Sequence, residues 1–520
     1  MQSTPTAISS WFRLDILALL AIFFVFYFYK MAHFSLSIDD ELEATQTYSS
    51  VWALTGRWAG YLFDKYLLPQ STIPFLPVFL FGFFASVSYV VSLRAFAVRK
   101  LAPAHYAAFP IYAAFPTWIF LAAFAANIAS AGIGLLFMAC AAYRYRRILD
   151  VLCTHLADRP QKIPLLDIAA GGIFLAISIG IYQSFIFAFF ALSLAVVLTM
   201  WLQDRATWKF LRQSAAALAS ITIVALVIYE IADNILRFLL NLSDRSYLGA
   251  FLDWRLMLQS PLTTALKVWR AMTDIYGGTP DFYGLHAFAF PLVLLFGVCG
   301  IASIPSLRPS ARAGACVFAA CILGVPFLQH FLADGFMPIR TLVAVPIVVW
   351  FFCMAGLTST HRRIATGAAL VLFVALFQIL YSSTLLQTAN YFVRVHDEML
   401  ATSVYNKIIE AHPDFSASRS YTVDFYGAKR FETSYPRPIS SSSGWSFFEW
   451  DGGNMGRILN YMHMMGFANL NAANDSQRRA DLTLFKDMPV WPAANSVKAV
   501  GDVTLIKLSD APGWPYNTPK

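Results

Sequence analysis

Long apolar runs recur along the chain from residue 14 to residue 386, and short polar segments separate them. A helix that crosses a membrane needs about 20 consecutive, mostly apolar residues, and we find about eleven runs that meet this rule. The runs are 14–36, 73–93, 104–122, 124–143, 164–182, 184–202, 213–232, 286–305, 313–332, 341–357 and 364–386. The pattern therefore predicts an all-α polytopic membrane domain over residues 1–386, with about 11 transmembrane helices.

Lysine and arginine residues gather in every second segment between these runs. Short loops rich in Lys and Arg face the cytoplasm in membrane proteins. The alternation predicts a cytoplasmic N-terminus and a C-terminus on the outer side. The residues that carry it are Arg13, Arg94, Arg99, Lys100, Arg144, Arg146, Arg147, Arg205, Lys209, Arg212, Arg308, Arg312, Arg362 and Arg363.

Three longer polar segments fall on the outer side by this rule: 37–72, 233–285 and 387–520. The first has a pattern typical of short amphipathic helices at the membrane interface. The last is long enough for a domain of its own. Its pattern predicts helices over 393–412 and 455–465 and strands over 420–425, 481–485 and 502–508. We expect residues 387–520 to form a small α/β or α+β extracytoplasmic domain.

Composition supports a chain that is solvated largely by lipid. Hydrophobic residues make up 58% of it and charged residues 13%, whereas soluble domains carry about 25% charged residues. The net charge of +8 does not indicate a nucleic-acid partner, because the basic residues lie in loops between apolar runs. Five of the six cysteines lie within apolar runs, which argues against a disulfide framework and against a cysteine metal site.

An acidic segment, Asp39-Asp40-Glu41, follows the first apolar run directly. Carboxylates are costly where a chain leaves the bilayer, unless they are solvated or used. Either Asp39 or Asp40 could be a general base for an acceptor hydroxyl, and the other could hold an arginine or a metal. The alternative is a solvated juncture, or a cap for a helix that starts near Glu41. The sequence leaves open which carboxylate would act.

Two further pairs of residues lie at predicted outer ends of the apolar runs. Arg57 precedes Trp58, and an outer arginine beside a tryptophan could bind a phosphate or stack on a sugar. Tyr182 precedes Gln183, whose amide could bond a sugar or a phosphate. The alternatives are an anchor at the membrane interface for the first pair and a turn between spans for the second.

Arg340 opens an apolar run on the outer side, where the positive-inside rule disfavours arginine. It should therefore have an anionic partner, either a phosphate or Asp334. His330 lies near the same end and could help to bind substrate. No cofactor is certain from the sequence. His330 with the acidic segment could make a divalent metal site, although no ligand spacing supports one.

The chain has no Walker A sequence, no usable dinucleotide-binding glycine motif and no zinc-protease motif. All polar candidates fall on the outer side, where nucleotide sugars are absent. An enzyme there needs an activated substrate that arrives on a lipid carrier. Polyprenyl-phosphate sugars meet this need.

Several short motifs resemble one family, the bacterial serotype-converting O-antigen glucosyltransferases. They are Ser-Ile-Asp-Asp-Glu at 37–41, Gly-Arg-Trp at 56–58, Tyr-Gln at 182–183, Arg-Thr-Leu-Val-Ala-Val-Pro at 340–346, Trp-Ser-Phe-Phe-Glu-Trp-Asp at 445–451 and Met-Pro-Val-Trp-Pro at 488–492. The resemblance covers most of the chain, and the first two motifs are its most specific part.

This resemblance implies a GT-C type glycosyltransferase in the bacterial inner membrane. The donor would be undecaprenyl-phosphate glucose, and the acceptor a sugar of the O-antigen repeat or another cell-surface glycan. Glucose is implied by the resemblance alone. The outer C-terminal domain would help to hold the acceptor, with Trp445 and Trp450 suited to sugar stacking. The alternative for these two tryptophans is the core of the small domain.

Two other functions stay open at this stage. A transporter or flippase of lipid-linked sugars would need polar residues at the bilayer midplane and related halves, and the runs show few such charges. A GT-C enzyme could also use a different sugar donor, such as mannose or arabinose. Transfer by the purified protein in detergent would separate an enzyme from a transporter.

Overall fold

The computed structural model describes residues 6–33, 36–45, 49–68, 73, 75–154, 164–205, 207–242, 254–304, 309–335, 337–436 and 444–513. The chain divides into two compact units. Unit 1 comprises residues 1–32, 48–383 and 438–441, and unit 2 comprises residues 33–47, 384–437 and 442–520. Each unit is described below by itself. The domain boundaries expected from the sequence stay predictions.

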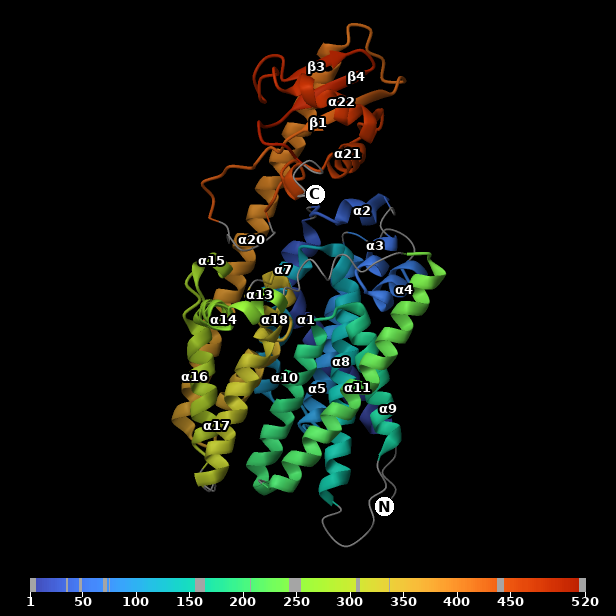
Figure 1. Cartoon of the computed structure of the whole chain (residues 1–520). Helices are drawn as coiled ribbons and strands as arrows, with labels where there is room; N and C mark the ends of the chain where they lie inside the picture. The colour runs from blue at the N-terminus through green and yellow to red at the C-terminus, as the bar shows by residue number, and fades with distance from the viewer. Residues whose placement is uncertain are drawn as a thin grey trace. The chain divides into compact units, whose positions relative to one another are not determined.

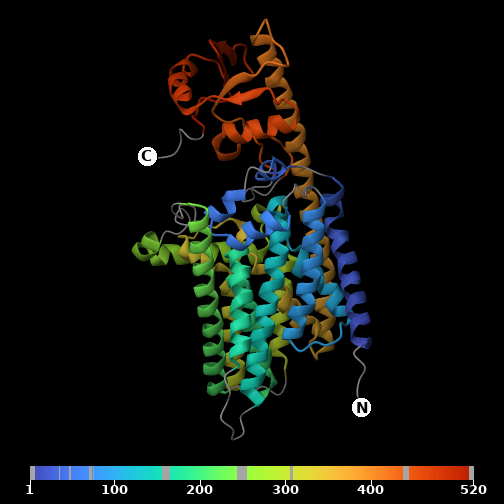
Figure 2. The ribbon, with the colours of Figure 1, turned by 90° about the vertical axis from the view of Figure 1, so that its right-hand side faces the viewer.

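Unit 1 is built from long apolar helices that run beside one another (Figure 1). Neighbouring pairs include α5 (Leu76–Ala95) with α8 (Ala125–Thr154), and α9 (Leu165–Ile181) with α11 (Trp208–Leu239). The view in Figure 2, turned by 90°, shows the same side-by-side arrangement. The other long helices are α1 (Thr6–Ala32), α10 (Phe185–Met200), α16 (Ala289–Ala302), α17 (Pro309–Gly324), α19 (Val345–Leu357) and α20 (Arg362–Ala411).

Seven helices within the described residues are long and apolar enough to cross a membrane. Each of the seven overlaps a predicted run, and the last, Arg362–Ala411, continues well beyond the predicted run 364–386. Three more runs form shorter apolar helices, α9, α16 and α19. The run at 104–122 is divided into α6 (Pro103–Ala114) and α7 (Pro116–Ala122), because Pro116 has no backbone N–H to continue the ladder. The mostly helical fold is confirmed, whereas the placement in a membrane and the count of about eleven spans stay predictions.

Short helices connect the long ones in unit 1. Five of them, α3, α4, α13, α14 and α15, lie within the predicted outer segments 37–72 and 233–285, of which residues 46–48, 69–72 and 243–253 fall outside the described residues. The short elements are α3 (Ser49–Leu54), α4 (Trp58–Tyr66), η1 (Trp201–Arg205), α13 (Trp254–Gln259), α14 (Pro261–Gly277), α15 (Pro280–Tyr283), η2 (Val325–Phe327), α18 (Leu328–Leu332) and η3 (Ile339–Thr341).

Unit 2 contains a small mixed sheet with the strand order β2-β1-β4-β3 (Figure 1). Its strands are β1 (Tyr421–Tyr426), β2 (Leu470–Ala472), β3 (Val497–Val500) and β4 (Val503–Lys507). β1 pairs in parallel with β2 and with β4, and β3 is antiparallel to β4. The helices of this unit are α2 (Asp40–Thr45), η4 (Trp450–Gly452), α21 (Met455–Met464), α22 (Asp475–Phe485) and the later part of α20. The small C-terminal sheet expected from the sequence is thus confirmed.

One strand prediction in this unit is wrong. Residues 481–485 were expected to be extended, but they form the last turns of α22. The helix is started by Asn474, whose side chain accepts the backbone N–H of Gln477 at 2.9 Å, and Gln477 in turn donates to Asp481 one turn later. These local bonds extend the helix through an alternating run that, taken alone, is typical of a strand.

Candidate active site

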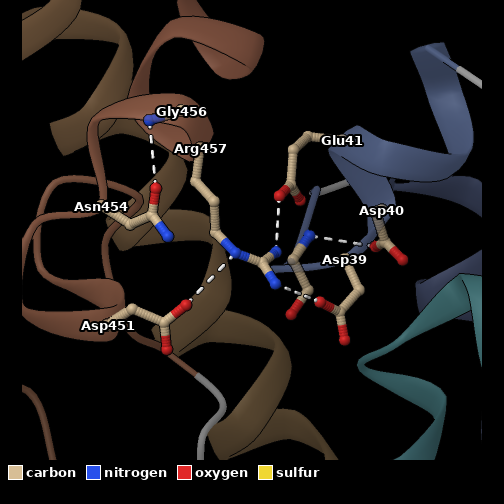
Figure 3. Close-up of polar contacts among 8 residues, drawn as sticks. Asp39, Asp40, Glu41, Asp451, Asn454, Gly456 and Arg457 are labelled. Carbon is tan, nitrogen blue, oxygen red and sulfur yellow. Dashed lines mark hydrogen bonds and ion pairs between the residues drawn. The ribbon is translucent and has the colours of Figure 1, made fainter. Parts of the chain in front are cut away.

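Arg457 joins three carboxylates from distant stretches of the chain, all of them in unit 2 (Figure 3). Its Nη1 lies 2.6 Å from Glu41 Oε1, and its Nη2 lies 2.9 Å from Asp39 Oδ1. Its Nε lies 3.3 Å from Asp451 Oδ2. All three nitrogens of one planar guanidinium are used, a geometry that suits arginine and not lysine. We call Asp39, Glu41, Asp451 and Arg457 the acidic cluster.

Asp40 is the one member of the acidic segment that Arg457 does not bind in Figure 3. Its Oδ2 accepts the backbone N–H of Ser37 at 3.0 Å, and its own N–H donates to the Ser37 carbonyl at 3.1 Å. Asp40 is completely buried. It therefore closes the turn that leads into α2, a local structural role of the kind that Asp and Asn often take at helix starts.

Asp39 is the accessible carboxylate of the segment. Its side chain is 28% exposed, whereas that of Glu41 is 0% exposed. The backbone of Asp39 has φ +75°, in the left-handed region that Asp enters more readily than most residues. An acceptor that comes from solvent can therefore reach Asp39 but not Asp40 or Glu41.

The carboxyls around Arg457 differ in their proton affinity. Burial raises the pKa of the Glu41 carboxyl to about 7, and the positive charge of Arg457 opposes this rise. Burial likewise raises the pKa of Asp451, again opposed by Arg457. Desolvation disfavours the charged form of a carboxyl, and a nearby cation favours it. Arg457 thus lowers the pKa of Glu41 and Asp451 relative to burial alone.

Trp445 and Trp450, both candidates for sugar binding, form an edge-on pair in unit 2. Their ring centres are 5.4 Å apart, and Trp445 is 42% exposed. The hydroxyl of Ser446 and the backbone N–H of Phe447 both donate to Asp397 of α20, which fixes the segment between the two rings. We call residues 445–453 the aromatic loop. Asp451 follows Trp450 directly, so this loop and the acidic cluster share a residue.

Arg57 lies among aromatic rings in unit 1. Its guanidinium is 5.3 Å from the centre of the Trp52 ring and 4.8 Å from that of Tyr182. Its Nη1 donates to Asn127 Oδ1 at 3.2 Å. Its Nε is buried and has no hydrogen-bond partner among the described residues. A cation held in this way retains a donor for an anionic ligand such as a phosphate.

Arg340 contacts Tyr182, the same tyrosine over which the Arg57 guanidinium lies. The Tyr182 hydroxyl donates to the Arg340 carbonyl at 3.5 Å, and the Arg340 guanidinium is 5.0 Å from the ring centre of Phe124. The two arginines predicted to bind phosphate therefore both contact Tyr182. Asp334, the alternative partner for Arg340, instead binds Lys267 Nζ at 2.6 Å. We call Arg57, Arg340 and Tyr182 the arginine pair with its tyrosine.

The remaining candidates of unit 1 have structural contacts of their own. Trp58 covers Gly180, where a Cβ would lie 2.5 Å from the indole ring, and the Trp58 Nε1 is buried with no partner among the described residues. Gln183 Nε2 donates to the Thr55 carbonyl at 2.9 Å, which ties the turn at 182–184 to the segment before Arg57. Both residues thus hold the surroundings of Arg57 in place.

His330 is buried in α18, with its ring 5.6 Å from that of Phe327. Its Nδ1 has no hydrogen-bond partner among the described residues. In the part of the chain that the structure describes, no three His, Cys, Asp or Glu side chains gather as metal ligands. Among the described residues, therefore, no set of carboxylates or thiols lies around His330 with which it could hold an ion.

Sequence reasoning missed Arg457, Asp451 and Asn127. Arg457 is one arginine on a short amphipathic helix in a neutral domain, and nothing local marks it. Asp451 carried a weak signal in the sequence, because it precedes two glycines, and the structure gives it a φ of +51°. Long-range pairs of this kind follow from the tertiary fold and leave no trace in spacing.

Comparison with known proteins decides the class of this chain. A sequence profile of the family described as Glucosyl transferase GtrII matches residues 28–357, well over half of the chain. The chain belongs to this family. Searches of curated proteins and of solved structures each gave no match. The resemblance drawn from the motifs is confirmed, and the protein is a membrane glycosyltransferase.

The matched region covers some of the candidate residues and not others. It includes the acidic segment, the arginine pair with its tyrosine, Trp58, Gln183 and His330. It ends before Trp445, Trp450 and Arg457. The acidic cluster therefore combines residues of the family region with residues beyond it.

Proposed function

We propose that this glucosyltransferase moves glucose from a polyprenyl-phosphate donor to a glycan acceptor of the cell surface, such as an O-antigen. The reaction takes place on the periplasmic side of the bacterial inner membrane, with the N-terminus in the cytoplasm and residues 387–520 as a periplasmic domain. Family membership supports the sugar class, and the seven apolar helices support a lipid-borne donor. The observation that carries the proposal is the accessible carboxylate of Asp39, bound on one oxygen by Arg457.

Asp39 acts as the general base in this proposal. Arg457 binds its Oδ1, which leaves Oδ2 for the acceptor hydroxyl. As the acceptor oxygen forms its bond to the sugar C1, the proton passes to Asp39, and the bond between C1 and the phosphate oxygen breaks. The electron pair leaves with the polyprenyl phosphate. A positioned base of this kind contributes about 10²–10⁴-fold to the rate.

The arginine pair with its tyrosine binds the donor phosphate. Arg57 offers its buried Nε, and Arg340, whose guanidinium lies beside Phe124, adds a second positive charge. Charge-assisted bonds to the phosphate strengthen as negative charge develops on the leaving oxygen. Tyr182, Gln183, Trp58 and His330 shape the surroundings of this phosphate. Trp445 and Trp450 stack on sugars of the acceptor.

The test is transfer by the purified full-length protein in detergent, with polyprenyl-phosphate glucose and O-antigen polysaccharides as acceptors. Release of polyprenyl phosphate and labelling of the acceptor are both measured. Wild-type protein should give both products, because transfer needs no second compartment. An absence of transfer with every acceptor, together with donor movement across vesicles, would instead support a transporter.

Asp39→Asn and Asp40→Asn form a matched pair for the base. Asp39→Asn should lower kcat by about 10²–10⁴-fold, because an amide cannot take the proton. Asp40→Asn should keep most of the activity, because its amide oxygen can still accept the Ser37 N–H. If the Asp39 variant stayed active, or if the Asp40 variant alone were inactive, the assignment of the base would be wrong.

A further inference from the structure

The contacts of Arg457 join two parts of the protein that no single motif connects. Glu41 and Asp39 belong to the family region, and Asp451 belongs to the aromatic loop beyond it. We propose that Arg457 is a positioning residue for glycosyl transfer, which holds Asp39 at a set place beside the aromatic loop that binds the acceptor. This inference rests on the proposed function, because it gives Asp39 and Trp450 their roles.

The first support is the geometry of the guanidinium. Three separate nitrogens reach three separate carboxylates at 2.6, 2.9 and 3.3 Å. The Arg457 side chain is only 19% exposed. A surface ion pair with two mobile side chains contributes little, whereas a fork with several bonds fixes each partner in direction as well as distance.

The second support is the backbone that presents the partners of Arg457. Asp451, Gly452 and Gly453 have φ values of +51°, +71° and +86°, so the loop turns back sharply after Trp450. A Cβ at Gly453 would lie 2.0 Å from the Gly427 carbonyl oxygen, so this turn packs closely on its neighbour. Asn454 then starts α21 by accepting the Gly456 N–H at 3.0 Å. Asp451 and Arg457 are therefore held by one compact turn.

The third support is the balance of charge. Asp39, Glu41 and Asp451 all face the same guanidinium, and like charges at this range repel one another. Without Arg457, repulsion would drive Asp39 away from Asp451 and from the aromatic loop. Glu41 would become a buried acid with no cation and would hold its proton more tightly. Both changes would misplace the base relative to the acceptor.

A purely structural role for Arg457 would lead to a different result. If Arg457 only stabilised unit 2, its variants would have less folded protein, but the folded fraction would transfer glucose with normal constants. A positioning residue changes kcat, the acceptor KM and the pH profile of folded protein. Misplacement of a reacting group by about 1 Å can cost about 10²-fold in rate.

The experiment compares Arg457→Lys and Arg457→Gln in the full chain, with Arg419→Gln as the matched control. Arg419 forms an ion pair with Asp414 in the same unit, but both side chains are exposed. Each variant is purified in detergent, and only the monodisperse fraction is assayed. We expect kcat to fall about 10²-fold for Arg457→Gln and less for Arg457→Lys. The acceptor KM should rise, the donor KM should stay, and the control should match wild type.

The dependence of kcat on pH is a second measurement, which would not change if Arg457 had a structural role alone. The charges that face Asp39 are Arg457, Glu41 and Asp451. Loss of the cation raises the pKa of Glu41 and Asp451, because no positive charge then opposes the effect of their burial. A step in kcat that follows these two carboxyls should therefore move to higher pH in Arg457→Gln and stay in place in Arg457→Lys.

Two outcomes separate this inference from the proposed function. If Asp39→Asn is inactive but folded Arg457→Gln keeps normal constants and a normal pH profile, Arg457 has no positioning role and the function stands. If Asp39→Asn is itself active, the proposed base is wrong. A double variant of Asp39→Asn and Arg457→Gln should be no slower than Asp39→Asn alone, because Arg457 acts through Asp39.

Discussion

The Arg57 guanidinium lies over the ring of Tyr182, with its Cζ 4.8 Å from the ring centre. The hydroxyl of the same tyrosine binds the backbone of Arg340. One aromatic side chain therefore contacts both the Arg57 guanidinium and the backbone of Arg340, whose own guanidinium lies beside the Phe124 ring. The aromatic rings stabilise the positive charge of Arg57 by cation–π contacts. That charge can therefore still interact with an anionic ligand.

Arg57→Lys should raise the donor KM by about tenfold, the equivalent of about 1.4 kcal/mol, with a small change in kcat. Lysine keeps the charge, but it loses the planar face that stacks and the buried Nε that donates. Arg57→Gln should raise the donor KM further. Lys65→Gln is the control, since Lys65 lies on the same short helix, α4, and binds only Tyr61 and its neighbours. An unchanged donor KM in both Arg57 variants would remove Arg57 from the phosphate site.

Glu41 should give the enzyme a titration near neutral pH. Burial raises the pKa of its carboxyl to about 7, so Glu41 is neutral below that pH and ionised above it. Its charge strengthens the hold on Arg457, and hence on Asp39, as the pH rises. The wild-type rate should therefore increase through about pH 7. Glu41→Gln should lack this step and keep the low-pH rate throughout.

The measurement is kcat against pH at saturating donor and acceptor, for wild type and Glu41→Gln. The groups that face Glu41 are Arg457 and Asp39, so the apparent pKa belongs to the set and not to one residue. Asp414→Asn, at an exposed ion pair, serves as the control. A step near neutral pH that persists in Glu41→Gln would assign the titration to another group.

Trp445 and Trp450 should determine affinity for the acceptor. Trp445→Ala and Trp450→Ala should each raise the acceptor KM by about tenfold and leave the donor KM unchanged, because the rings are in unit 2 and offer flat apolar faces to sugars. Leu484→Ala removes an exposed apolar residue of similar accessibility from the same unit and should have no effect. A rise in donor KM, or no rise at all, would contradict the acceptor role.

Some parts of this structure could be predicted from sequence, and the physical reason differs for each. The apolar runs locate the helices, because a helix in contact with lipid needs a long stretch of apolar residues. The same rule missed the break at Pro116, because hydrophobicity alone does not show that proline lacks a backbone N–H. Residues 481–485 alternate like a strand, yet the cap at Asn474 starts a helix that continues through them.

Sequence alone likewise identified only part of the candidate site. Asp39, Arg57 and Arg340 were marked by charge in an unusual place, beside or within apolar runs. Arg457 was not, because a charged residue outside the apolar runs is ordinary. Its contact with Glu41 spans 416 positions and depends on the tertiary fold. A charged residue beside or within an apolar run can be recognised from the sequence, whereas the residue that it contacts in the folded chain cannot.

The buried pair of Arg478 and Asp424 should stabilise unit 2. Arg478 Nε lies 3.0 Å from Asp424 Oδ1, and the two side chains are 7% and 0% exposed. Arg478→Ala would leave the Asp424 charge buried without its cation, which costs about 3–5 kcal/mol. Arg419→Ala breaks an exposed pair in the same unit and should cost about 0–1 kcal/mol.

Thermal unfolding of the full chain in detergent, followed by limited proteolysis at each temperature, measures this difference. Cleavage in residues 444–513 should begin at a lower temperature in Arg478→Ala than in wild type or Arg419→Ala. Asp424→Asn should be milder than Arg478→Ala, because the amide oxygen and the Phe425 carbonyl can still accept N–H bonds from the Arg478 guanidinium, whereas Arg478→Ala removes the N–H that Asp424 Oδ1 accepts. Equal onset in all variants would show that this pair does not hold unit 2 together.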